Sequence, residues 1–265
     1  MRLGRIPRET TVNPYGRPLF FGGGEEAILI LHGFTGRTGE MSYMATRLNE
    51  RGYTVSVPRL PGHGTNGQDF LQSDADQWLR HTIDAYLELR RRYRRVYVAG
   101  LSMGGLLALL IASRFDPDGV ALCAPALRVT RRNIVFSPVV GRFVTRWSTP
   151  YEPDAEDPLE RELQLEYYAY EWVRPAGELY RLMRRARRAV RSVAAPTLTV
   201  VSAADELVPP EVADFVARRV PPTTRTHRVL LTESDHVIVN GTERERVAAE
   251  VASWFETTTA DGRNP

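Results

Sequence analysis

Short apolar runs recur along the chain, and longer stretches of mixed character separate them. Each run holds four to six residues, and most are rich in β-branched side chains and bounded by Gly or Pro. A run of this length and composition predicts a buried strand rather than a helix. The six runs are Ala27–Leu31, Tyr53–Val57, Val96–Ala99, Gly119–Cys123, Thr197–Val201 and Thr226–Leu231.

Helical patterns fill most of the gaps between these runs. Met41–Arg51, Asp74–Tyr93 and Val247–Phe255 each repeat apolar side chains at the spacing of an amphipathic helix. Met103–Arg114 is apolar on nearly all sides, which predicts a buried helix. Strands that alternate with helices predict an α/β fold with a mostly parallel central sheet flanked by helices.

The alternation stops between Cys123 and Thr197, where the pattern predicts no strand. Residues 131–158 are irregular and rich in Pro and aromatic side chains. Pro158–Trp172 and Gly177–Val193 have helical patterns. This region interrupts the strand–helix order, so we interpret it as an insertion that lies over the sheet.

The chain therefore divides into two parts. We predict a core made of residues 1–127 and 194–265, and a small inserted cap made of residues 128–193. The helix predicted at Gly177–Val193 has one apolar face and one face rich in arginine. We interpret the arginine-rich face as a solvated helix surface rather than as an anion-binding patch.

The basic residues exclude several kinds of chemistry. All 35 are arginine, and the chain has no lysine. A P-loop, a pyridoxal phosphate Schiff base and a kinase phosphate site each need a lysine amine. The net charge is only +3, because 32 carboxylates lie among the arginines, so we predict no nucleic-acid partner. We also expect no cofactor.

Three features bear on where the protein lies. No run of eighteen apolar residues occurs, so we expect no membrane span. Residues 1–16 contain no apolar segment of the signal-peptide type, which predicts that a Sec signal peptide is absent. The single cysteine, Cys123, cannot form an intramolecular disulfide. Together these features predict a cytoplasmic protein.

One motif indicates a reactive serine. Gly100-Leu-Ser102-Met-Gly104 matches G-x-S-x-G, follows the apolar run Val96–Ala99 and opens the predicted buried helix. In this context the chain must turn sharply from a strand into a helix, so that the serine Oγ projects at the tip. Glycines on either side allow neighbouring chain to pass close to the turn. We therefore predict that Ser102 is a nucleophile.

A serine hydroxyl needs a base at neutral pH, and histidine is the usual one. In this arrangement the base follows the serine and the acid in the chain, which leaves His227 and His236. His227 lies inside a predicted strand, where an edge or surface position is expected. His236 lies in a polar loop beyond that strand, so we choose His236 as the base.

The acid that orients the histidine should lie in a loop after an earlier strand. Asp205 follows the run Thr197–Val201 in this way, and we choose it. Adjacent residues in a tight loop rarely direct both side chains to one point, so Asp235, next to His236, is interpreted as a turn residue. The weaker candidates are Glu206, Asp154 and Asp157.

A tetrahedral intermediate also needs two N–H donors at its oxyanion. We predict the amide of Met103, directly after the serine, and the amide of Phe34 in the loop that follows the first strand. His32 is expected to be structural, and His63 is expected to lie in a tight surface loop. The histidines show no close-spaced ligand pair, so we predict no metal site.

Five separated motifs resemble the bacterial carboxylesterase and monoacylglycerol lipase family of the α/β-hydrolase superfamily. They are LHGFTG, GYTVSVPRLPGHGT, GLSMGG, DELVP and SDHVI, and the match extends in this order from about residue 27 to about residue 255. The resemblance implies an α/β-hydrolase fold with a small cap inserted after the sixth core strand. It also implies that Ser102, Asp205 and His236 form the catalytic triad, with Phe34 and Met103 as oxyanion donors.

The sequence therefore predicts a serine hydrolase that cleaves a small-molecule carboxylic ester through an acyl-enzyme, either a carboxylesterase or a monoacylglycerol lipase. A thioesterase or amidase with the same triad is the nearest alternative, and a non-catalytic binding protein on the same fold is another. Aromatic side chains of the predicted cap either line an acyl pocket or pack the cap onto the core: Phe136, Phe143, Trp147, Tyr167, Tyr168, Tyr170 and Trp172.

Overall fold

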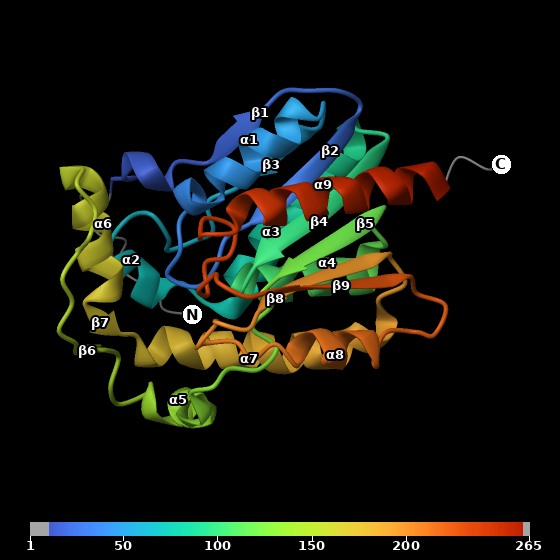
Figure 1. Ribbon diagram of the computed structural model, residues 1–265. Helices are drawn as coiled ribbons and strands as arrows, with labels where there is room; N and C mark the ends of the chain where they lie inside the picture. Colours follow the sequence, from blue (N-terminus) through green and yellow to red (C-terminus); the bar gives the residue numbers. More distant parts are fainter. Residues whose placement is uncertain (1–10, 262–265) are drawn as a thin grey trace.

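The computed structural model describes residues 11–261, and a seven-stranded sheet forms its centre (Figure 1). The strand order is β1-β3-β2-β4-β5-β8-β9, in which β1 is antiparallel to β3 and all other neighbours are parallel. The predicted α/β architecture with a mostly parallel sheet is confirmed. The strands are β1 Leu19–Phe21, β2 Glu26–Leu31, β3 Thr54–Val57, β4 Arg95–Leu101, β5 Gly119–Cys123, β8 Thr197–Ser202 and β9 Thr226–Leu231.

The central strands bury side chains on both faces of the sheet. In β2, Ala27, Leu29 and Leu31 belong to one apolar cluster, whereas Ile28 and Ile30 belong to the other. All five side chains are fully buried. Strands covered on both faces need apolar residues at every position, which explains why they read as continuous apolar runs in the sequence.

Helices cover the two faces (Figure 1). The first face carries α1 (Ser42–Glu50) and α9 (Arg244–Asp261), and the second carries α3 (Ala75–Arg92), α4 (Met103–Phe115), α7 (Val173–Ala189) and α8 (Val212–Ala217). The start of α3 is capped by the Asp74 carboxylate, which accepts the Gln77 N–H at 2.8 Å. Of the helices formed within residues 11–261, none is long and apolar enough to cross a membrane.

The structure differs from the sequence prediction at several boundaries. The sequence pattern does not predict β1, α8 or the short helix α2 (Gly67–Gln72), all of which the structure contains. α6 (Pro158–Tyr168) ends four residues earlier than predicted, because Tyr170–Glu171 pairs as a strand. α7 begins four residues earlier than predicted, which places Pro175 in its first turn, where proline is tolerated. The expectation of no signal peptide concerns residues 1–10 in part, and these lie outside the described residues.

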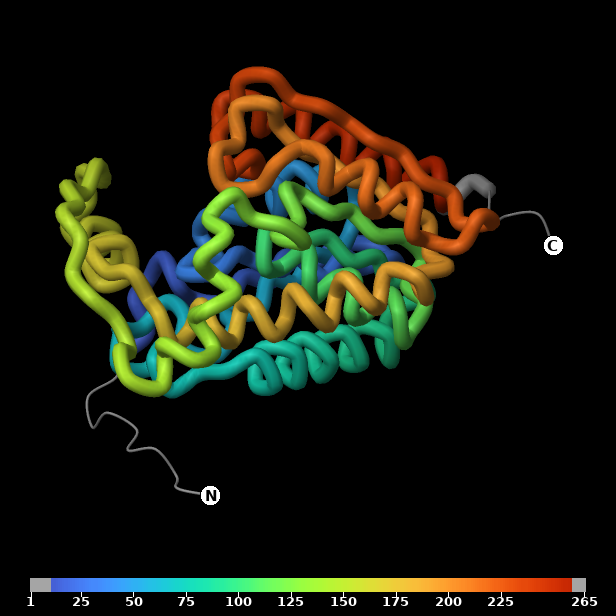
Figure 2. The backbone as a smooth tube through the Cα atoms, turned by 90° about the horizontal axis from the view of Figure 1, so that it is seen from below, coloured from blue at the N-terminus to red at the C-terminus, as the bar shows by residue number. Residues whose placement is uncertain are grey.

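Residues 128–193 leave the sheet after β5 and return to it at β8. Their outer part holds α5 (Ser137–Val140), β6 (Trp147–Ser148), α6 and β7 (Tyr170–Glu171), and its stretch around α6 projects to one side of the layered core (Figure 2). β6 and β7 form a separate antiparallel pair. α7, in contrast, places Leu182 and Ala186 in the same buried cluster as α4. The segment thus combines an outer portion with an inner helix that closes one face of the core.

The turn from β4 into α4 depends on two glycines at points of close approach. A Cβ added to Gly104 would lie 2.1 Å from the Leu31 carbonyl oxygen. A Cβ added to Gly100 would lie 2.3 Å from the Gly104 carbonyl carbon. Because these are backbone atoms at the centre of the sheet, they cannot move aside without displacing β2 or α4. The glycines therefore allow the strand, the helix and the end of β2 to meet.

We predict that Gly104→Ala lowers the free energy of unfolding by about 3 kcal/mol or more, because the new methyl group overlaps the backbone of β2. Chemical denaturation followed by circular dichroism would measure the loss. Gly22→Ala is the matched control: an added Cβ there meets nothing within 4 Å, and stability should stay within about 0.5 kcal/mol of wild type. Equal midpoints for the two variants would contradict the close-approach argument.

Candidate functional site

Ser102 lies at the tip of the turn between β4 and α4. Its backbone has φ 54° and ψ −110°, a conformation that non-glycine residues adopt only when the surrounding structure enforces it. Neighbouring chain holds both sides of the residue: the Ser102 N–H donates to the Cys123 carbonyl at 2.9 Å, and the Ser102 carbonyl accepts the Ala126 N–H at 3.2 Å. This geometry projects the hydroxyl beyond the carboxyl ends of the parallel strands.

His236 reaches Ser102 from the loop after β9. The carboxylate of Glu243 organises this loop, since its Oε2 accepts N–H groups from Thr232, Glu233 and Ser234 at 3.0–3.2 Å. The Nε2 atom of His236 lies 2.9 Å from Ser102 Oγ. The two residues stand 134 positions apart in the chain and meet because their loops leave the same edge of the sheet.

Asp205 completes a continuous line of hydrogen bonds. Its Oδ2 lies 2.8 Å from His236 Nδ1, and its Oδ1 accepts the N–H groups of Leu207 and Val208 at 2.8 and 2.9 Å. Burial would raise the pKa of Asp205, but the hydrogen bond and charge interaction with His236 and the two backbone donors together lower it. An ionised carboxylate only accepts, so His236 Nδ1 carries a proton and Nε2 is free to accept the Ser102 hydroxyl proton.

The structure also places the rival residues. Asp235 caps its own turn by accepting the Val237 N–H at 3.1 Å. Asp154 accepts a hydrogen bond from Gln164 at 2.7 Å. His227 lies on the edge strand β9 with its ring stacked against Trp254 at 6.1 Å. Among the predicted residues, the structure therefore brings together Ser102, Asp205 and His236.

Phe34 and Met103 flank Ser102. Met103 is the first residue of α4, where the leading N–H groups of a helix have no partner inside the helix. The loop that carries Phe34 lies against the serine, since a Cβ added to Gly33 would be 3.5 Å from Ser102 Cβ. Thr35 adopts a positive φ of 57°, and its hydroxyl donates to the Phe34 carbonyl at 2.6 Å. The role of both amides as oxyanion donors stays a prediction.

Two buried histidines support this loop from below. His32 Nε2 accepts the Leu60 N–H at 3.1 Å, so its Nδ1 carries the proton and donates to the Gly33 carbonyl at 3.0 Å. Burial lowers the pKa of His32 to about 4, which keeps the ring neutral near pH 7. The expected surface position of His63 is wrong: its ring is fully buried and packs edge-on against His32 and Phe70.

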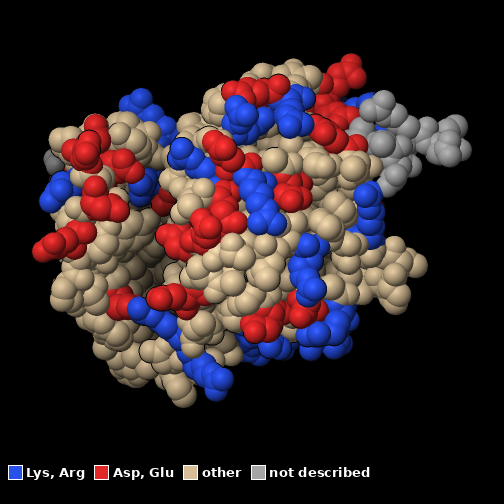
Figure 3. Space-filling view, viewed as in Figure 1, with Lys and Arg blue, Asp and Glu red and all other residues tan. Residues whose placement is uncertain are grey.

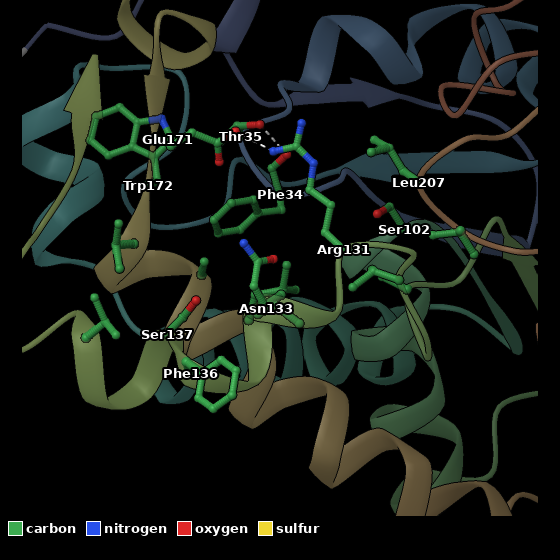
Figure 4. Close-up of a pocket in the computed structure, with 18 of the residues that line it drawn as sticks. Phe34, Thr35, Ser102, Arg131, Asn133, Phe136, Ser137, Glu171, Trp172 and Leu207 are labelled. Carbon is green, nitrogen blue, oxygen red and sulfur yellow. Dashed lines mark hydrogen bonds and ion pairs between the residues drawn. The ribbon is translucent and has the colours of Figure 1, made fainter. Parts of the chain in front are cut away.

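An apolar cavity of about 640 Å³ opens at Ser102 and His236. Figure 4 shows Phe34, Trp172 and Leu207 around it, and Arg131 reaching toward Glu171, with which it forms an ion pair. The aromatic side chains of the predicted cap differ in position. Phe136, Trp147 and Trp172 line this cavity, whereas the Tyr167 ring is buried against Phe70 and its hydroxyl donates to the Gly62 carbonyl.

A second cavity, of about 590 Å³, shares Ser102 and His236 with the first but extends toward Glu40 and Tyr168. The carboxylates in its lining are Glu40, Glu206 and Asp235, and among the described residues no arginine lines it. Acidic side chains gather beside the hollow in this face of the molecule (Figure 3). The two cavities thus differ in character, one apolar and the other acidic.

Sequence reasoning did not identify the buried cluster at the far end of the second cavity. The Tyr168 hydroxyl donates to Glu40 Oε1 at 2.9 Å, and Arg37 lies 3.4 Å from the same carboxylate oxygen. Arg37 also pairs with Glu160 of α6. Burial raises the pKa of Glu40, although Arg37 and Tyr168 lower it in part. Partners as far apart as Glu40 and Tyr168 leave no local signal in the sequence.

Within residues 11–261, no group of three or more His, Cys, Asp or Glu side chains could hold a metal ion. The rings of His32 and His63 are buried and hydrogen-bond to backbone groups of Leu60 and Pro61. The ring nitrogens of His236 hydrogen-bond to Ser102 and Asp205.

Comparisons with known proteins find hydrolases. A family model named Hydrolase_4 and described as serine aminopeptidase, S33, matches residues 24–243. A carboxylesterase of Bacillus subtilis (strain 168) is 27% identical over 91% of this chain and 96% of its own length. A thermostable monoacylglycerol lipase of Bacillus sp. (strain H-257) is 32% identical over 83% of this chain and 86% of its own length.

Solved structures extend the likeness to three dimensions. A structure reported for LipS and LipT, two metagenome-derived lipolytic enzymes, superposes with a TM-score of 0.83 at 25% identity, covering 93% of this chain and 100% of that one. The monoacylglycerol lipase of Paleococcus ferrophilus superposes with a TM-score of 0.74 at 20% identity, covering 91% of this chain and 98% of that one. The second likeness concerns the fold alone.

The lowered pKa of His32 predicts a pH-dependent stability. Below pH 6.5 the unfolded chain protonates this histidine while the folded protein does not, so the free energy of unfolding falls as the pH drops from 6.5 to 4. The His32 contribution to this fall should be about 3 kcal/mol. In His32→Gln the fall between pH 7 and 4 should be smaller by about this amount, as measured by urea denaturation at each pH.

His227→Gln is the control for that measurement, because it replaces an exposed histidine on the edge strand. This variant should keep the pH dependence of the wild type. If His32→Gln lost stability with falling pH as steeply as the wild type, the neutral buried state of His32 would be wrong.

Proposed function

The chain belongs to the α/β-hydrolase family of carboxylesterases and monoacylglycerol lipases, and on that premise we propose that it hydrolyses carboxylic esters by acyl transfer to Ser102. The observation that carries the proposal is the line of hydrogen bonds from Ser102 Oγ through His236 to Asp205, at 2.9 and 2.8 Å. A serine hydroxyl becomes an effective nucleophile when a base in this position removes its proton.

The reaction would proceed in two steps. His236 Nε2 takes the Ser102 proton while Oγ attacks the ester carbonyl, and Asp205 stabilises the imidazolium that forms. The amides of Phe34 and Met103 would donate to the oxyanion of the tetrahedral intermediate. His236 then returns the proton to the departing alcohol, leaving an acyl-enzyme. Water repeats the sequence, His236 accepting its proton, and the acid is released.

The two cavities supply positions for the two halves of the substrate. The apolar cavity suits the acyl chain, because it is lined by side chains such as Phe34, Trp147 and Trp172. In this proposal residues 128–193 act as the cap, with the outer part of the segment forming one wall of that cavity. The acidic cavity would receive the leaving alcohol. The prediction of a cytoplasmic protein rests on Cys123 and the N-terminal sequence and stays a prediction.

The charge of the second cavity distinguishes a carboxylic ester from a thioester of coenzyme A as the substrate. A thioester of coenzyme A has a leaving group with several negative phosphates, and Glu206 and Asp235 would repel it, whereas Glu40 is paired with Arg37. Neutral or cationic alcohols meet no such repulsion. An ester of an uncharged or positively charged alcohol is therefore favoured over an acyl-CoA thioester. An amidase uses the same residues, and anilides in place of esters would distinguish it.

Replacement of Ser102 tests the site directly. Ser102→Ala should reduce ester turnover by about 10⁴-fold or more, because the acyl-enzyme cannot form. Labelling by a serine-directed fluorophosphonate, read as a mass shift, should disappear with it. Ser113→Ala, on the same helix with its hydroxyl bonded to the Leu110 carbonyl, should keep both.

Two outcomes would contradict the proposal at different levels. Full activity in Ser102→Ala would reject the site. A wild-type protein that neither takes the label nor turns over esters would instead support a non-catalytic binding protein on this fold.

A second prediction concerns the charge of the leaving group. For esters of one acyl chain, butyrate, kcat/KM should be about tenfold lower with an anionic glycolate leaving group than with glycerol or choline. The difference should shrink at 0.5 M salt, since exposed charges are screened. Glu206→Gln should also reduce the difference in kcat/KM between the anionic and the uncharged leaving group. Glu256→Gln, which removes one negative charge on α9 outside the cavity, should leave that difference unchanged. An anionic ester turned over as well as the glycerol ester would contradict the leaving-group assignment.

A further inference from the structure

The inserted segment reaches the neighbourhood of the Phe34 loop at Tyr168, the last residue of α6. The Tyr168 hydroxyl donates to Glu40 Oε1 at 2.9 Å. Glu40 belongs to the short 3-10 helix η2 (Thr38–Met41), which follows that loop, and only 7% of its surface is exposed. A hydrogen bond shielded from water in this way is strong and directional, so it fixes the relative position of the two residues that it joins.

The Glu40 carboxylate lies against the turn that contains the Phe34 amide. This turn is closed by the Gly36 N–H, which donates to the Gly33 carbonyl at 3.2 Å. A Cβ added to Gly36 would lie 2.8 Å from Glu40 Oε2, so this oxygen packs directly on the turn. The Glu40 N–H also donates to the Arg37 carbonyl at 3.2 Å. Glu40 therefore supports the end of the turn through both its side chain and its backbone.

The turn needs support on both sides. Thr35 has a positive φ of 57°, which is unfavourable for a β-branched residue and persists only where neighbouring groups enforce it. His32 holds the start of the turn, because its Nδ1 donates to the Gly33 carbonyl at 3.0 Å. That support comes from the core alone. The support at the other end, Glu40, is the one that contacts the inserted segment.

α6 is itself fixed to the core beside Tyr168. The Tyr167 hydroxyl donates to the Gly62 carbonyl at 2.8 Å. The Glu166 carboxylate accepts the Gly67 N–H at 2.9 Å. Three consecutive residues of the helix thus contact the core through their side chains. The Tyr168 hydroxyl is therefore presented to Glu40 from a fixed position.

A buried arginine adds a second connection between Glu40 and α6. Arg37 lies 3.4 Å from Glu40 Oε1 and also pairs with Glu160 of α6. Its side chain is only 11% exposed, so solvent screens these interactions weakly. The Glu40 carboxylate is therefore joined to α6 directly through the Tyr168 hydroxyl and indirectly through the Arg37 guanidinium.

We propose that Glu40 and Tyr168 are positioning residues for the reaction at Ser102, which hold the turn so that the Phe34 amide faces the oxyanion. The proposal rests on the proposed function, in which that amide is an oxyanion donor. Such a donor acts mainly on the transition state, and a small displacement removes much of its effect. Loss of either side chain should therefore lower kcat and leave KM close to that of the wild type.

Steady-state kinetics with ethyl butyrate and glyceryl butyrate test the positioning. Each kcat is divided by the fraction of protein that a fluorophosphonate labels at completion, so that inactive protein is not counted. We expect kcat to fall about fivefold in Tyr168→Phe and about tenfold in Glu40→Ala, equally for both esters, with KM within about twofold of wild type. Tyr151→Phe is the matched control, because its ring packs edge-on against Tyr168, and it should keep the wild-type kcat.

Three further measurements distinguish positioning from a general structural role. Glu40→Gln keeps an oxygen that can accept the Tyr168 hydroxyl, so it should recover most of the kcat lost in Glu40→Ala. The double variant Glu40→Ala, Tyr168→Phe should have the kcat of Glu40→Ala, because the hydroxyl acts through Glu40. A boronic acid that forms a tetrahedral adduct with Ser102 should bind Tyr168→Phe more weakly, by the factor by which kcat falls.

Several results would overturn the positioning. These are a wild-type kcat in Tyr168→Phe, additive losses in the double variant, or boronic acid binding that stays unchanged while kcat falls. A loss that differs between the two esters would assign Glu40 and Tyr168 to binding of the alcohol instead. A wild type that hydrolyses neither ester and takes up no label would reject the proposed function and the positioning with it. Full kcat in Tyr168→Phe beside an active wild type would reject the positioning alone.

Discussion

The backbone of Ser102 is the constraint on which the site depends. A serine at φ 54° and ψ −110° is strained, and the strain persists because β4, α4 and the end of β2 leave no other route for the chain. Gly100 and Gly104 allow that crowding, and the Cys123 carbonyl and the Ala126 N–H hold the turn from the other side. The sheet therefore positions the hydroxyl at the edge where the loops carrying Asp205 and His236 emerge.

Much of this arrangement could be predicted from local signals in the sequence. Strands buried on both faces appear as apolar runs, and the G-x-S-x-G pattern needs only five residues in the right context. The choice of His236 and Asp205 followed from chain order and from their place in loops after strands. The hydrogen bonds at 2.9 and 2.8 Å bring those residues together with Ser102, as that order predicts. The strands and the G-x-S-x-G turn can be predicted from the sequence because each depends on residues within a few positions of one another.

The remaining features depend on contacts between distant residues, which leave no local pattern. His63 lies between glycines and reads as a surface turn, yet its ring is buried beneath the Phe34 loop because Phe70, Trp78 and Tyr167 pack around it. The contact of Glu40 with Tyr168 spans 128 positions. The helix ends in the inserted segment differ from the sequence prediction for the same reason, because β7 forms only by pairing with β6. Tertiary packing decides such positions after the local preferences are set.

The hydrogen bonds that align the site have a consequence for how this fold can diversify. Ser102, His236, Asp205 and the amides that hold the aspartate all lie outside residues 128–193. The segment touches them at its start, where the Thr130 N–H and hydroxyl donate to the carbonyls of Leu207 and Glu206. Sequence in the outer part of the segment can therefore vary while Ser102, His236 and Asp205 keep their own supports, whereas α7 is fixed because it packs in the same buried cluster as α4. Mutation there can change the lining of the apolar cavity without altering this line of hydrogen bonds.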